Sequence, residues 1–259
     1  MTERIIARKD GAIGWLVFNN PQRRNAVSLD MWEAIPGVLA SFAADAAIRV
    51  VVLTGAGDKA FVSGADISQF EKERSTPETV ARYDAMGEKA QTALKMCDKP
   101  VIAMIRGYCI GGGLNIANLC DLRIAADDAR FGIPAAKMGL GYRASSMKHL
   151  VDIVGGGYAR EIMITARQFS AEEALRMGLV QKVVPVHELE KTVREYCDMI
   201  AANAPLTMRA AKRIIREVSA AEYDTEACQG WVKECFDSED YREGRRAFME
   251  KRKPVFKGK

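Results

Sequence analysis

Histidine is scarce in this sequence of 259 residues, because only His149 and His187 are present and they lie in unrelated contexts. A metal site built from several histidines therefore cannot form, and we expect no metal centre. Neither histidine lies near a Gly-x-Ser-x-Gly turn, so the sequence also argues against a hydrolase with a Ser–His–acid triad.

Paired cysteines and long apolar runs are absent as well. The six cysteines form no Cys-x-x-Cys pair, which excludes zinc ribbons and thioredoxin-type redox motifs, and most of them lie in apolar runs typical of buried, reduced thiols. The longest apolar stretch, residues 107–120, is interrupted by glycines and is too short to span a bilayer. Because residues 1–4 lead into a strand pattern and not into a signal peptide, we expect a cytoplasmic protein without membrane contact.

A strong excess of charge is also missing. The 38 Lys and Arg residues exceed the 34 Asp and Glu residues by a net charge of +4, with a sequence pI near 8.7. This weak excess is unlike the clustered basic surface of a nucleic-acid-binding protein, so we expect no nucleic-acid partner. It would suit an anionic small ligand. Hydrophobic residues make up 48% of the chain, which is ordinary for a globular protein and excludes disorder.

The first part of the chain alternates between strand and helix patterns. Short apolar runs predict strands at residues 5–8, 14–19, 50–54, 101–105 and 122–125. Helical spacing predicts helices at residues 29–42, after the N-cap candidate Ser28, and at about 77–96. Pro36 lies inside the first of these and argues against an unbroken helix. This alternation predicts an α/β fold around a mainly parallel sheet.

From about residue 145 the pattern becomes helical. Ser170 and Glu173 form a capping-box signature, and Ser238 is a good N-cap for a last helix. After a short strand at residues 180–184, we expect helices at residues 187–202, 206–218, 225–236 and 239–251. The chain is therefore interpreted as an α/β core over residues 1–200 followed by a helical region over residues 201–259, and not as two independent domains.

Two small-residue turns stand out, at residues 61–67 and 107–114. Each follows a predicted strand and leads to a helix start, where backbone N–H groups lack partners within the helix. Two such turns facing each other would offer a pair of backbone donors to one oxygen, which is an oxyanion hole. The alternative is that the glycines only allow tight turns. The three glycines at residues 111–113 match neither a dinucleotide fingerprint nor a P-loop.

Several strings occur in the order and spacing of one known family. The strings are Asn-Pro-Gln-Arg-Arg-Asn-Ala at 20–26, Phe-Val-Ser-Gly-Ala-Asp-Ile at 61–67, Lys-Pro-Val-Ile-Ala at 99–103 with Gly-Tyr at 107–108, Gly-Gly-Gly at 111–113, Cys-Asp-Leu-Arg-Ile-Ala at 120–125, Phe-Gly at 131–132 and Phe-Met-Glu-Lys-Arg-Lys at 248–253. On these strings the chain resembles the enoyl-CoA hydratase/isomerase (crotonase) superfamily over nearly its whole length. The resemblance implies a spiral of ββα units, as in the related Clp-type fold, with a helical C-terminal trimerisation region. It also implies a homotrimer or homohexamer.

The resemblance further implies an acyl-CoA substrate, with coenzyme A as part of that substrate and no separate cofactor. Two backbone amides that stabilise a thioester enolate map onto Ala65 and Gly112. The CoA-binding residues map onto two segments, the first with Arg23, Arg24 and Ala26 and the second with Ser63, Gly64, Asp66 and Ile67. In the family the last helix reaches the CoA site of a neighbouring subunit, and this contribution maps onto Phe248 and Lys251. The charges of Arg23, Arg24 and Lys251 suit CoA phosphates.

The sequence departs from the family pattern at the two glutamates that act as general acid and base in hydratases. Asn115 stands at the first position and Ala135 at the second. Asparagine cannot carry a proton at neutral pH, and alanine cannot hydrogen-bond through its side chain. We therefore expect chemistry on an acyl-CoA other than two-glutamate hydration, with Asn115 and the nearby Tyr142 as catalytic candidates. Ala135 and Arg143 are expected to line the substrate site.

Other functions stay open at this stage. The segment around Tyr142 and Arg143 is similar to that of the methylmalonyl-CoA decarboxylase branch, in which loss of carbon dioxide forms the enolate and Arg143 or Asn115 could hold a carboxylate. A non-catalytic acyl-CoA-binding homologue is a further possibility. A Clp-type serine peptidase is disfavoured because neither histidine is placed for a triad. Tyr83 is a weaker candidate for the acyl pocket, and Asp121 and Arg123 are interpreted as structural.

Overall fold

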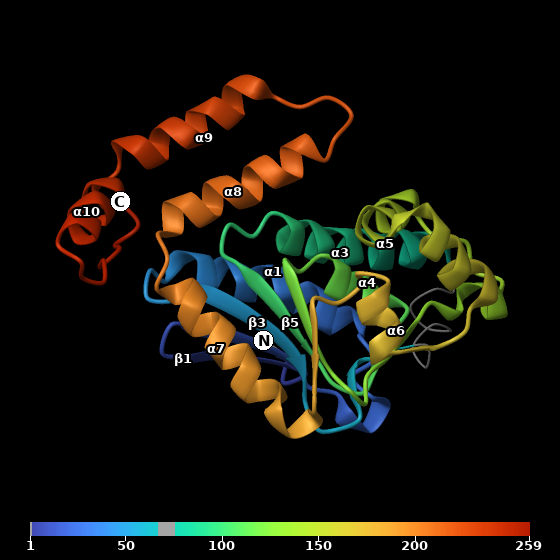
Figure 1. Ribbon diagram of the computed structural model, residues 1–259. Helices are drawn as coiled ribbons and strands as arrows, with labels where there is room; N and C mark the ends of the chain where they lie inside the picture. The colour runs from blue at the N-terminus through green and yellow to red at the C-terminus, as the bar shows by residue number, and fades with distance from the viewer. Residues whose placement is uncertain (1, 67–75) are drawn as a thin grey trace.

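A computed structural model describes residues 2–66 and 76–259 of the chain. Its main sheet has the strand order β1-β2-β3-β5-β7-β10 (Figure 1). The strands are β1 (Ile5–Asp10), β2 (Ile13–Phe18), β3 (Val50–Gly55), β5 (Val101–Ile105), β7 (Leu122–Ala126) and β10 (Lys182–Val184). Only the β1–β2 pair is antiparallel among the described pairings of this sheet, which confirms the mainly parallel sheet predicted from the sequence.

A second sheet, which the sequence did not reveal, has the order β4-β6-β8-β9. Its strands are β4 (Ala60–Val62), β6 (Tyr108–Ile110), β8 (Arg130–Gly132) and β9 (Phe169–Ser170). Runs of two or three residues are too short to show an alternating pattern, so sequence periodicity could not find them. The long strands β3, β5 and β7 are each followed by a short strand of this sheet and then by a helix. This repeated ββα unit confirms the predicted spiral core.

The helices of the core follow the predicted pattern, with one correction. The helix α1 (Leu29–Ala44) runs through Pro36 without a break, because its apolar face is fixed against the core by Met31, Trp32, Ile35, Val38, Leu39 and Phe42. Ser28 occupies the N-cap position, but its hydroxyl donates to the Asp30 carboxylate and caps no backbone N–H. The helix α3 (Pro77–Lys95) begins after a Thr76 capping box, as its Pro at the first position predicts.

The remaining elements of the core lie between its strands or directly after the last of them. They are η1 (Pro21–Arg23), α4 (Gly112–Asn118), η3 (Pro134–Met138), α5 (Ala144–Thr165), α6 (Ala171–Arg176) and η4 (Val186–Glu188), of which η1, η3 and η4 are 3-10 turns. Gly155 interrupts α5 with φ +72°. The capping box of α6 is confirmed, since Glu173 N donates to Ser170 Oγ over 3.2 Å and Ser170 N donates to the Glu173 carboxylate over 2.8 Å.

Apolar residues fill both faces of the main sheet. One face packs with α1 and α3, and the other is covered by α7 (Leu189–Ala201), whose Val193 and Cys197 join Trp15 and Val52 in a second core. Four of the six cysteines, Cys97, Cys109, Cys120 and Cys197, are buried, and all six are free thiols. This confirms their interpretation as mainly buried, reduced groups.

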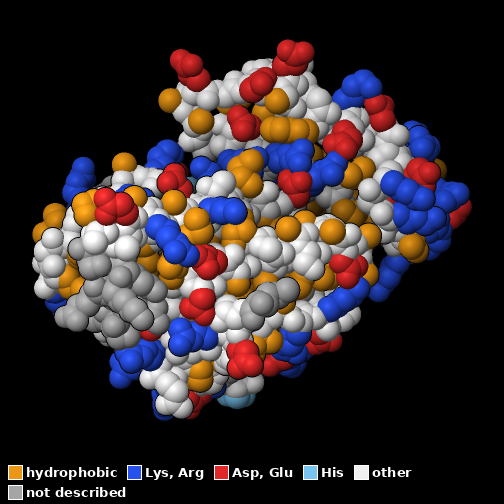
Figure 2. Space-filling view, turned by 180° about the vertical axis from the view of Figure 1, so that it is seen from behind, with side chains coloured by type: hydrophobic (Ala, Val, Ile, Leu, Met, Phe, Trp, Pro, Cys, Tyr) orange, Lys and Arg blue, Asp and Glu red, His pale blue; other side chains and the backbone are white. Residues whose placement is uncertain are grey.

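The last helices, α8 (Pro205–Val218), α9 (Thr225–Asp237) and α10 (Glu239–Met249), form a lobe that projects from the core (Figure 1). We call these three helices and the following tail the C-terminal lobe. Lys and Arg side chains gather on it around α10, at the right of the view from behind (Figure 2). Arg49 ties the lobe to the core, because it donates to the carbonyl of Phe256 in the tail over 3.2 Å and to that of Asn203, just before α8, over 2.9 Å.

Candidate active site

The two glycine-marked turns meet beside the segment at residues 24–27. Val27 N donates to Gly64 O over 2.8 Å, and Asp66 N donates back to Val27 O over 3.0 Å. Ser63 N donates to Arg24 O over 3.1 Å. Segments from the first two strings of the sequence therefore lie side by side and hold the Ala65 turn in place.

Ala65 and Gly112 lie against each other through their backbones. A Cβ added at Gly112 would be 3.7 Å from the Ala65 nitrogen, which is ordinary van der Waals distance. Neither of the two N–H groups donates to an acceptor in the part of the chain that the structure describes. Two adjacent unpaired backbone donors can stabilise negative charge on one oxygen.

A different structural reason explains the presence of glycine at each of the three consecutive positions 111–113. Gly111 has φ +55°, a conformation that favours glycine. A Cβ on Gly113 would be 2.0 Å from Val62 O, so this position tolerates no side chain. Gly112 is the first residue of α4, and the space beside its amide is bounded by Gly64 and Ala65. Two glycines thus build the turn, and the third leaves the amide accessible.

Asn115 lies one turn further along α4 from Gly112. Its side-chain nitrogen donates to Ser146 Oγ on α5 over 3.2 Å. Its Oδ1 is buried and has no hydrogen-bond partner within the described residues. An unpaired buried acceptor is costly, so this oxygen is suited to a donor supplied by a ligand or by water. Sequence reasoning did not find the Ser146 contact, because the two residues are far apart in the chain.

Tyr142 lies next to the same turn. Its hydroxyl donates to Gly111 O over 3.4 Å, a long and weak bond. Burial raises the pKa of Tyr142 well above its usual value, and a hydrogen bond with the Asn115 side chain offsets this only in part. The phenol is therefore neutral across the physiological range, where it can donate a hydrogen bond but cannot act as a base.

Ala135 and Arg143 are placed differently from each other. Ala135, in η3, is buried against the core and brings only a methyl group. Arg143 is paired with Asp84 of α3, and about half of its side chain is exposed. This ion pair ties the segment before α5 to α3. It also engages the guanidinium that was predicted to hold a substrate carboxylate.

The segment at residues 23–26 contains a structural residue that the sequence reasoning missed. Asn25 is fully buried with φ +57°, and its amide donates to Ala60 O and Ala56 O over 2.7 and 3.0 Å. The signal was available, because asparagine adopts the left-handed conformation more readily than most residues. Asn25 thereby fixes its neighbours Arg24 and Ala26 against β4.

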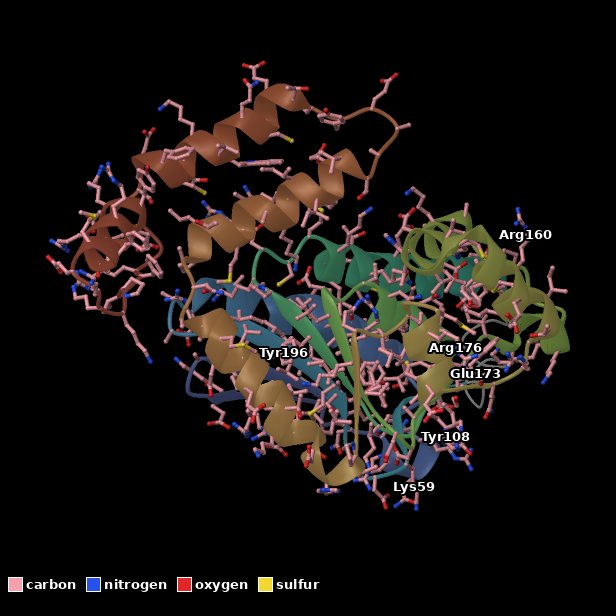
Figure 3. The ribbon with its side chains drawn as sticks, viewed as in Figure 1. Lys59, Tyr108, Arg160, Glu173, Arg176 and Tyr196 are labelled. Atoms are coloured by element: carbon pink, nitrogen blue, oxygen red, sulfur yellow. The ribbon has the colours of Figure 1, made fainter. Side chains whose placement is uncertain are left out.

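Among the predicted CoA-binding residues, the arginines have weak internal partners. Arg23 lies 3.8 Å from the Asp66 carboxylate, and Ser63 Oγ donates to Arg23 O over 3.3 Å. The Arg24 guanidinium stacks 4.9 Å from the Tyr108 ring centre. Tyr108 lies with Lys59 at one end of the second sheet (Figure 3). These contacts leave N–H donors of both guanidinium groups for an anion. Ile67 lies outside the described residues.

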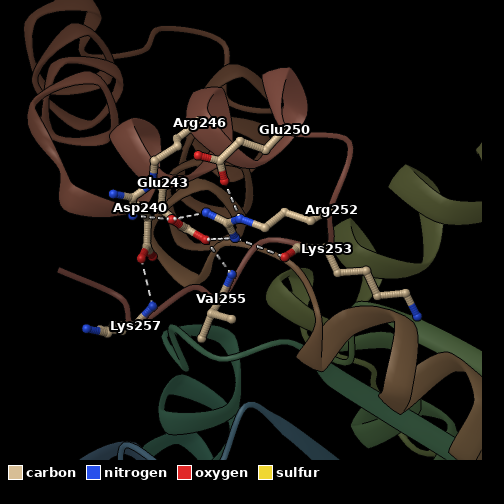
Figure 4. Close-up of polar contacts among 8 residues, drawn as sticks. All are labelled: Asp240, Glu243, Arg246, Glu250, Arg252, Lys253, Val255 and Lys257. Atoms are coloured by element: carbon tan, nitrogen blue, oxygen red, sulfur yellow. Dashed lines mark hydrogen bonds and ion pairs between the residues drawn. The ribbon is translucent and has the colours of Figure 1, made fainter.

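Phe248 and Lys251 lie in the C-terminal lobe, on the other side of the molecule from α4 (Figure 1). Phe248 is 82% exposed, and Lys251 follows α10 with φ +55°. Within one chain the structure does not bring them to the Ala65–Gly112 turns. The tail beyond them folds back on α10, because Asp240 accepts from the N–H groups of Lys257 and Gly258 and Glu243 binds Arg252 (Figure 4).

The remaining candidates have internal roles. The Tyr83 hydroxyl accepts from Trp32 Nε1 over 3.3 Å in the core. The Asp121 carboxylate accepts from Val101 N and Lys212 Nζ, each over 2.7 Å, which confirms its structural role. Across residues 2–66 and 76–259, no group of three or more His, Cys, Asp or Glu side chains could hold a metal ion. In the same residues no helix is long and apolar enough to cross a membrane.

Comparison with known proteins identifies the family of this chain. The family described as enoyl-CoA hydratase/isomerase matches residues 8–259. The short-chain-enoyl-CoA hydratase of Clostridium acetobutylicum is 38% identical over 251 residues, covering 96% of this chain and 95% of the relative. The carnitinyl-CoA dehydratase of Escherichia coli strain K12 is 33% identical over 267 residues, covering all of both chains.

A solved structure agrees with these matches. The enoyl-CoA hydratase/carnithine racemase of Magnetospirillum magneticum superposes with a TM-score of 0.96 at 36% identity, covering 100% of this chain and 97% of the other. The match confirms the crotonase fold together with the helical C-terminal region. The chain belongs to the enoyl-CoA hydratase/isomerase family.

Proposed function

We propose that this protein is an acyl-CoA enzyme that stabilises a thioester enolate at the amides of Ala65 and Gly112, by chemistry other than two-glutamate hydration. The observation that carries the proposal is a pair of adjacent amides beside Asn115 and Tyr142 that have no acceptor among the described residues. Relatives named as hydratases and dehydratases of CoA thioesters support the substrate class. The same relatives support an enzyme of this family.

The two amides supply most of the catalysis in this scheme. The thioester oxygen accepts hydrogen bonds from both N–H groups, and these bonds strengthen as negative charge develops on it. Removal of one such donor costs on the order of 3 kcal/mol of transition-state stabilisation. Asn115 and Tyr142 hold the acyl group or a water by neutral hydrogen bonds, because neither side chain carries a proton away near neutral pH.

Decarboxylation of a carboxylated acyl-CoA is the second candidate. It is favoured because the hydrogen-bond partners that the structure describes for Asn115 and Tyr142 are neutral, and loss of carbon dioxide forms the enolate without a carboxylate base. This reaction requires a partner for the substrate carboxylate. Arg143 can supply it only if its ion pair with Asp84 opens.

A backbone substitution at Gly112 tests the proposal. Proline fits the first position of a helix and removes the N–H, so Gly112→Pro deletes one donor. Gly112→Ala is the matched control, because it adds the same Cβ at an ordinary contact distance and keeps the N–H. Across a panel of acyl-CoA thioesters, turnover by Gly112→Pro should fall about 100-fold or more below that of Gly112→Ala.

The outcomes separate the functions. Equal turnover by the two variants contradicts the oxyanion role. Acyl-CoA binding by calorimetry without turnover of any thioester identifies a non-catalytic homologue. Release of carbon dioxide from malonyl-CoA or methylmalonyl-CoA establishes the decarboxylase.

The C-terminal lobe supports an oligomer, which we propose to be a homotrimer or homohexamer in the cytoplasm. An apolar groove of about 770 Å³ lies between α8, α9 and α10. Several large apolar side chains of this lobe are exposed in the single chain: Ile215, Val232, Phe236, Phe248 and Met249. A second copy of the chain is the proposed occupant, and the predicted role of Phe248 and Lys251 in a neighbour's CoA site depends on it.

A further inference from the structure

Arg123 is a buried cation directly behind the helix that carries the Gly112 amide. It is the second residue of β7 and is only 4% exposed. Its Nε donates to Leu179 O over 2.6 Å, and its Nη1 donates to Cys120 O over 2.8 Å and to Ala117 O over 3.4 Å. The latter two carbonyls belong to the end of α4 and to the turn that follows it.

Among the residues that the structure describes, no carboxylate is paired with this charge. Arg123 forms no ion pair with any residue that the structure describes. The neighbouring Asp121 carboxylate is bound to Lys212 Nζ and to the amide of Val101. A buried guanidinium that is held only by main-chain carbonyls keeps a positive field in a medium of low dielectric constant.

We propose that Arg123 is a positioning residue for the oxyanion site, which fixes the far end of α4 and supplies a buried positive charge behind the Gly112 amide. The inference rests on the proposed use of that amide and adds a residue that does not touch the substrate.

The geometry sets the size of the effect. At 1.5 Å per residue, a thioester oxygen at the Gly112 amide would lie about 12 Å from the Arg123 guanidinium. A unit charge at about 12 Å, with an effective dielectric constant of about 20, changes the rate of enolate formation about tenfold. If Arg123 only anchored α4, the rate of enolate formation would not depend on its charge in this way.

Two substitutions separate charge from anchoring. Arg123→Lys keeps the charge but loses the forked donor, whereas Arg123→Gln keeps a donor but loses the charge. Gln181→Ala is the matched control, because Gln181 Oε1 accepts from Arg123 N over 2.7 Å and is neutral. Circular dichroism and thermal unfolding first identify the variants that fold.

The readout is the infrared carbonyl stretch of butyryl-CoA labelled with ¹³C at the thioester carbon, bound to each variant. In the unchanged protein the band should lie at a lower frequency than in solution. Arg123→Lys and Gln181→Ala should keep this downshift, and Arg123→Gln should reduce it. With a turned-over thioester, Arg123→Gln should lower kcat about tenfold and change KM less than about twofold.

An equal downshift in folded Arg123→Gln and in the unchanged protein overturns the proposal. Loss of the downshift in folded Arg123→Lys overturns the proposed role of the charge, because that variant keeps the charge, and this result suffices if Arg123→Gln does not fold. If butyryl-CoA binds to the unchanged protein without a downshift, or does not bind, the proposed oxyanion site itself is wrong and the role of Arg123 falls with it.

Discussion

The side-chain amide of Asn115 donates to the Ser146 hydroxyl over 3.2 Å, and Asn115 Oδ1 is buried without a partner among residues 2–66 and 76–259. An amide can present either end to a ligand. With the nitrogen held by Ser146, the oxygen is the end that remains available, so the site offers an acceptor where the family resemblance places a titrating glutamate. Ser146 thus determines what Asn115 can recognise.

Loss of the Ser146 hydroxyl should disturb this arrangement. Ser146→Ala removes the partner that orients Asn115, and we expect affinity for the preferred acyl-CoA to fall by about 3- to 10-fold with about 1 kcal/mol lost from the free energy of unfolding. Isothermal titration calorimetry measures the affinity. Ser145→Ala is the control, because Ser145 is exposed and precedes it directly. Equal affinities of the two variants would contradict the role of Ser146.

Release of Arg143 should change substrate preference. Asp84→Asn removes the ion-pair partner of Arg143, and the freed guanidinium is expected to raise affinity for malonyl-CoA several-fold. The stability cost should stay below about 1 kcal/mol because the pair is largely exposed. Glu33→Gln on α1 is the control, because it breaks another exposed ion pair of α3, that between Glu33 and Arg82. An unchanged preference for malonyl-CoA over butyryl-CoA would show that Arg143 does not reach the acyl group.

Gly113 should tolerate no side chain. A Cβ there would lie 2.0 Å from Val62 O, a backbone atom that cannot move without shifting β4. We expect Gly113→Ala to lower the free energy of unfolding by about 3 kcal/mol or more, and Gly112→Ala to lower it by less than about 1 kcal/mol. Urea denaturation of both variants checks this difference. Similar midpoints would mean that the turn is less tightly packed than the structure indicates.

Much of this arrangement follows from the sequence, and the reasons for the exceptions are physical. The strand at Val101–Ile105 and the helix that begins at Pro77 have strong local signals, namely an apolar run and a Pro at a favoured first-turn position, and both lie where predicted. The short strands of the second sheet have no such signal, because they are held by pairing with distant segments. The glycine turns were found, since close backbone approach requires small residues.

The features of the site that could not be predicted from the sequence depend on contacts between residues that are distant in the chain. The Asn115–Ser146 bond and the Arg143–Asp84 pair join residues on different helices, and no local pattern specifies either of them. Arg123 was predicted to be structural from its place at a strand start. Its burial and its bonds to the carbonyls of Ala117 and Cys120 became visible only when α4 and β7 were packed together.

Alkaline pH should destabilise the fold through two buried thiols. Burial raises the pKa of Cys120 and of Cys197 from 9.0 to about 12. The contribution of these thiols to the free energy of unfolding is therefore fully present below about pH 9, where the unfolded chain also keeps them protonated. It is lost as pH rises toward 12. Each thiol should reduce the free energy of unfolding by up to about 1.4 kcal/mol per pH unit in this window. Urea denaturation from pH 7 to 11 measures the slope, which should be shallower in the Cys120→Ala/Cys197→Ala double variant; an identical slope would assign the loss to other groups.

The exposed apolar groups of the C-terminal lobe should hold copies of the chain together. Phe248 and Met249 are 82% and 81% exposed in the single chain, so they contribute little to its own packing. Phe248→Asp/Met249→Asp should therefore leave the circular dichroism spectrum unchanged and convert the oligomer to monomers in sedimentation velocity, because charges in an apolar interface are costly. Ile164→Asp is the control, since Ile164 is 75% exposed on α5, outside the lobe. A monomer before substitution, or an oligomer that survives it, would show that this groove is not the interface.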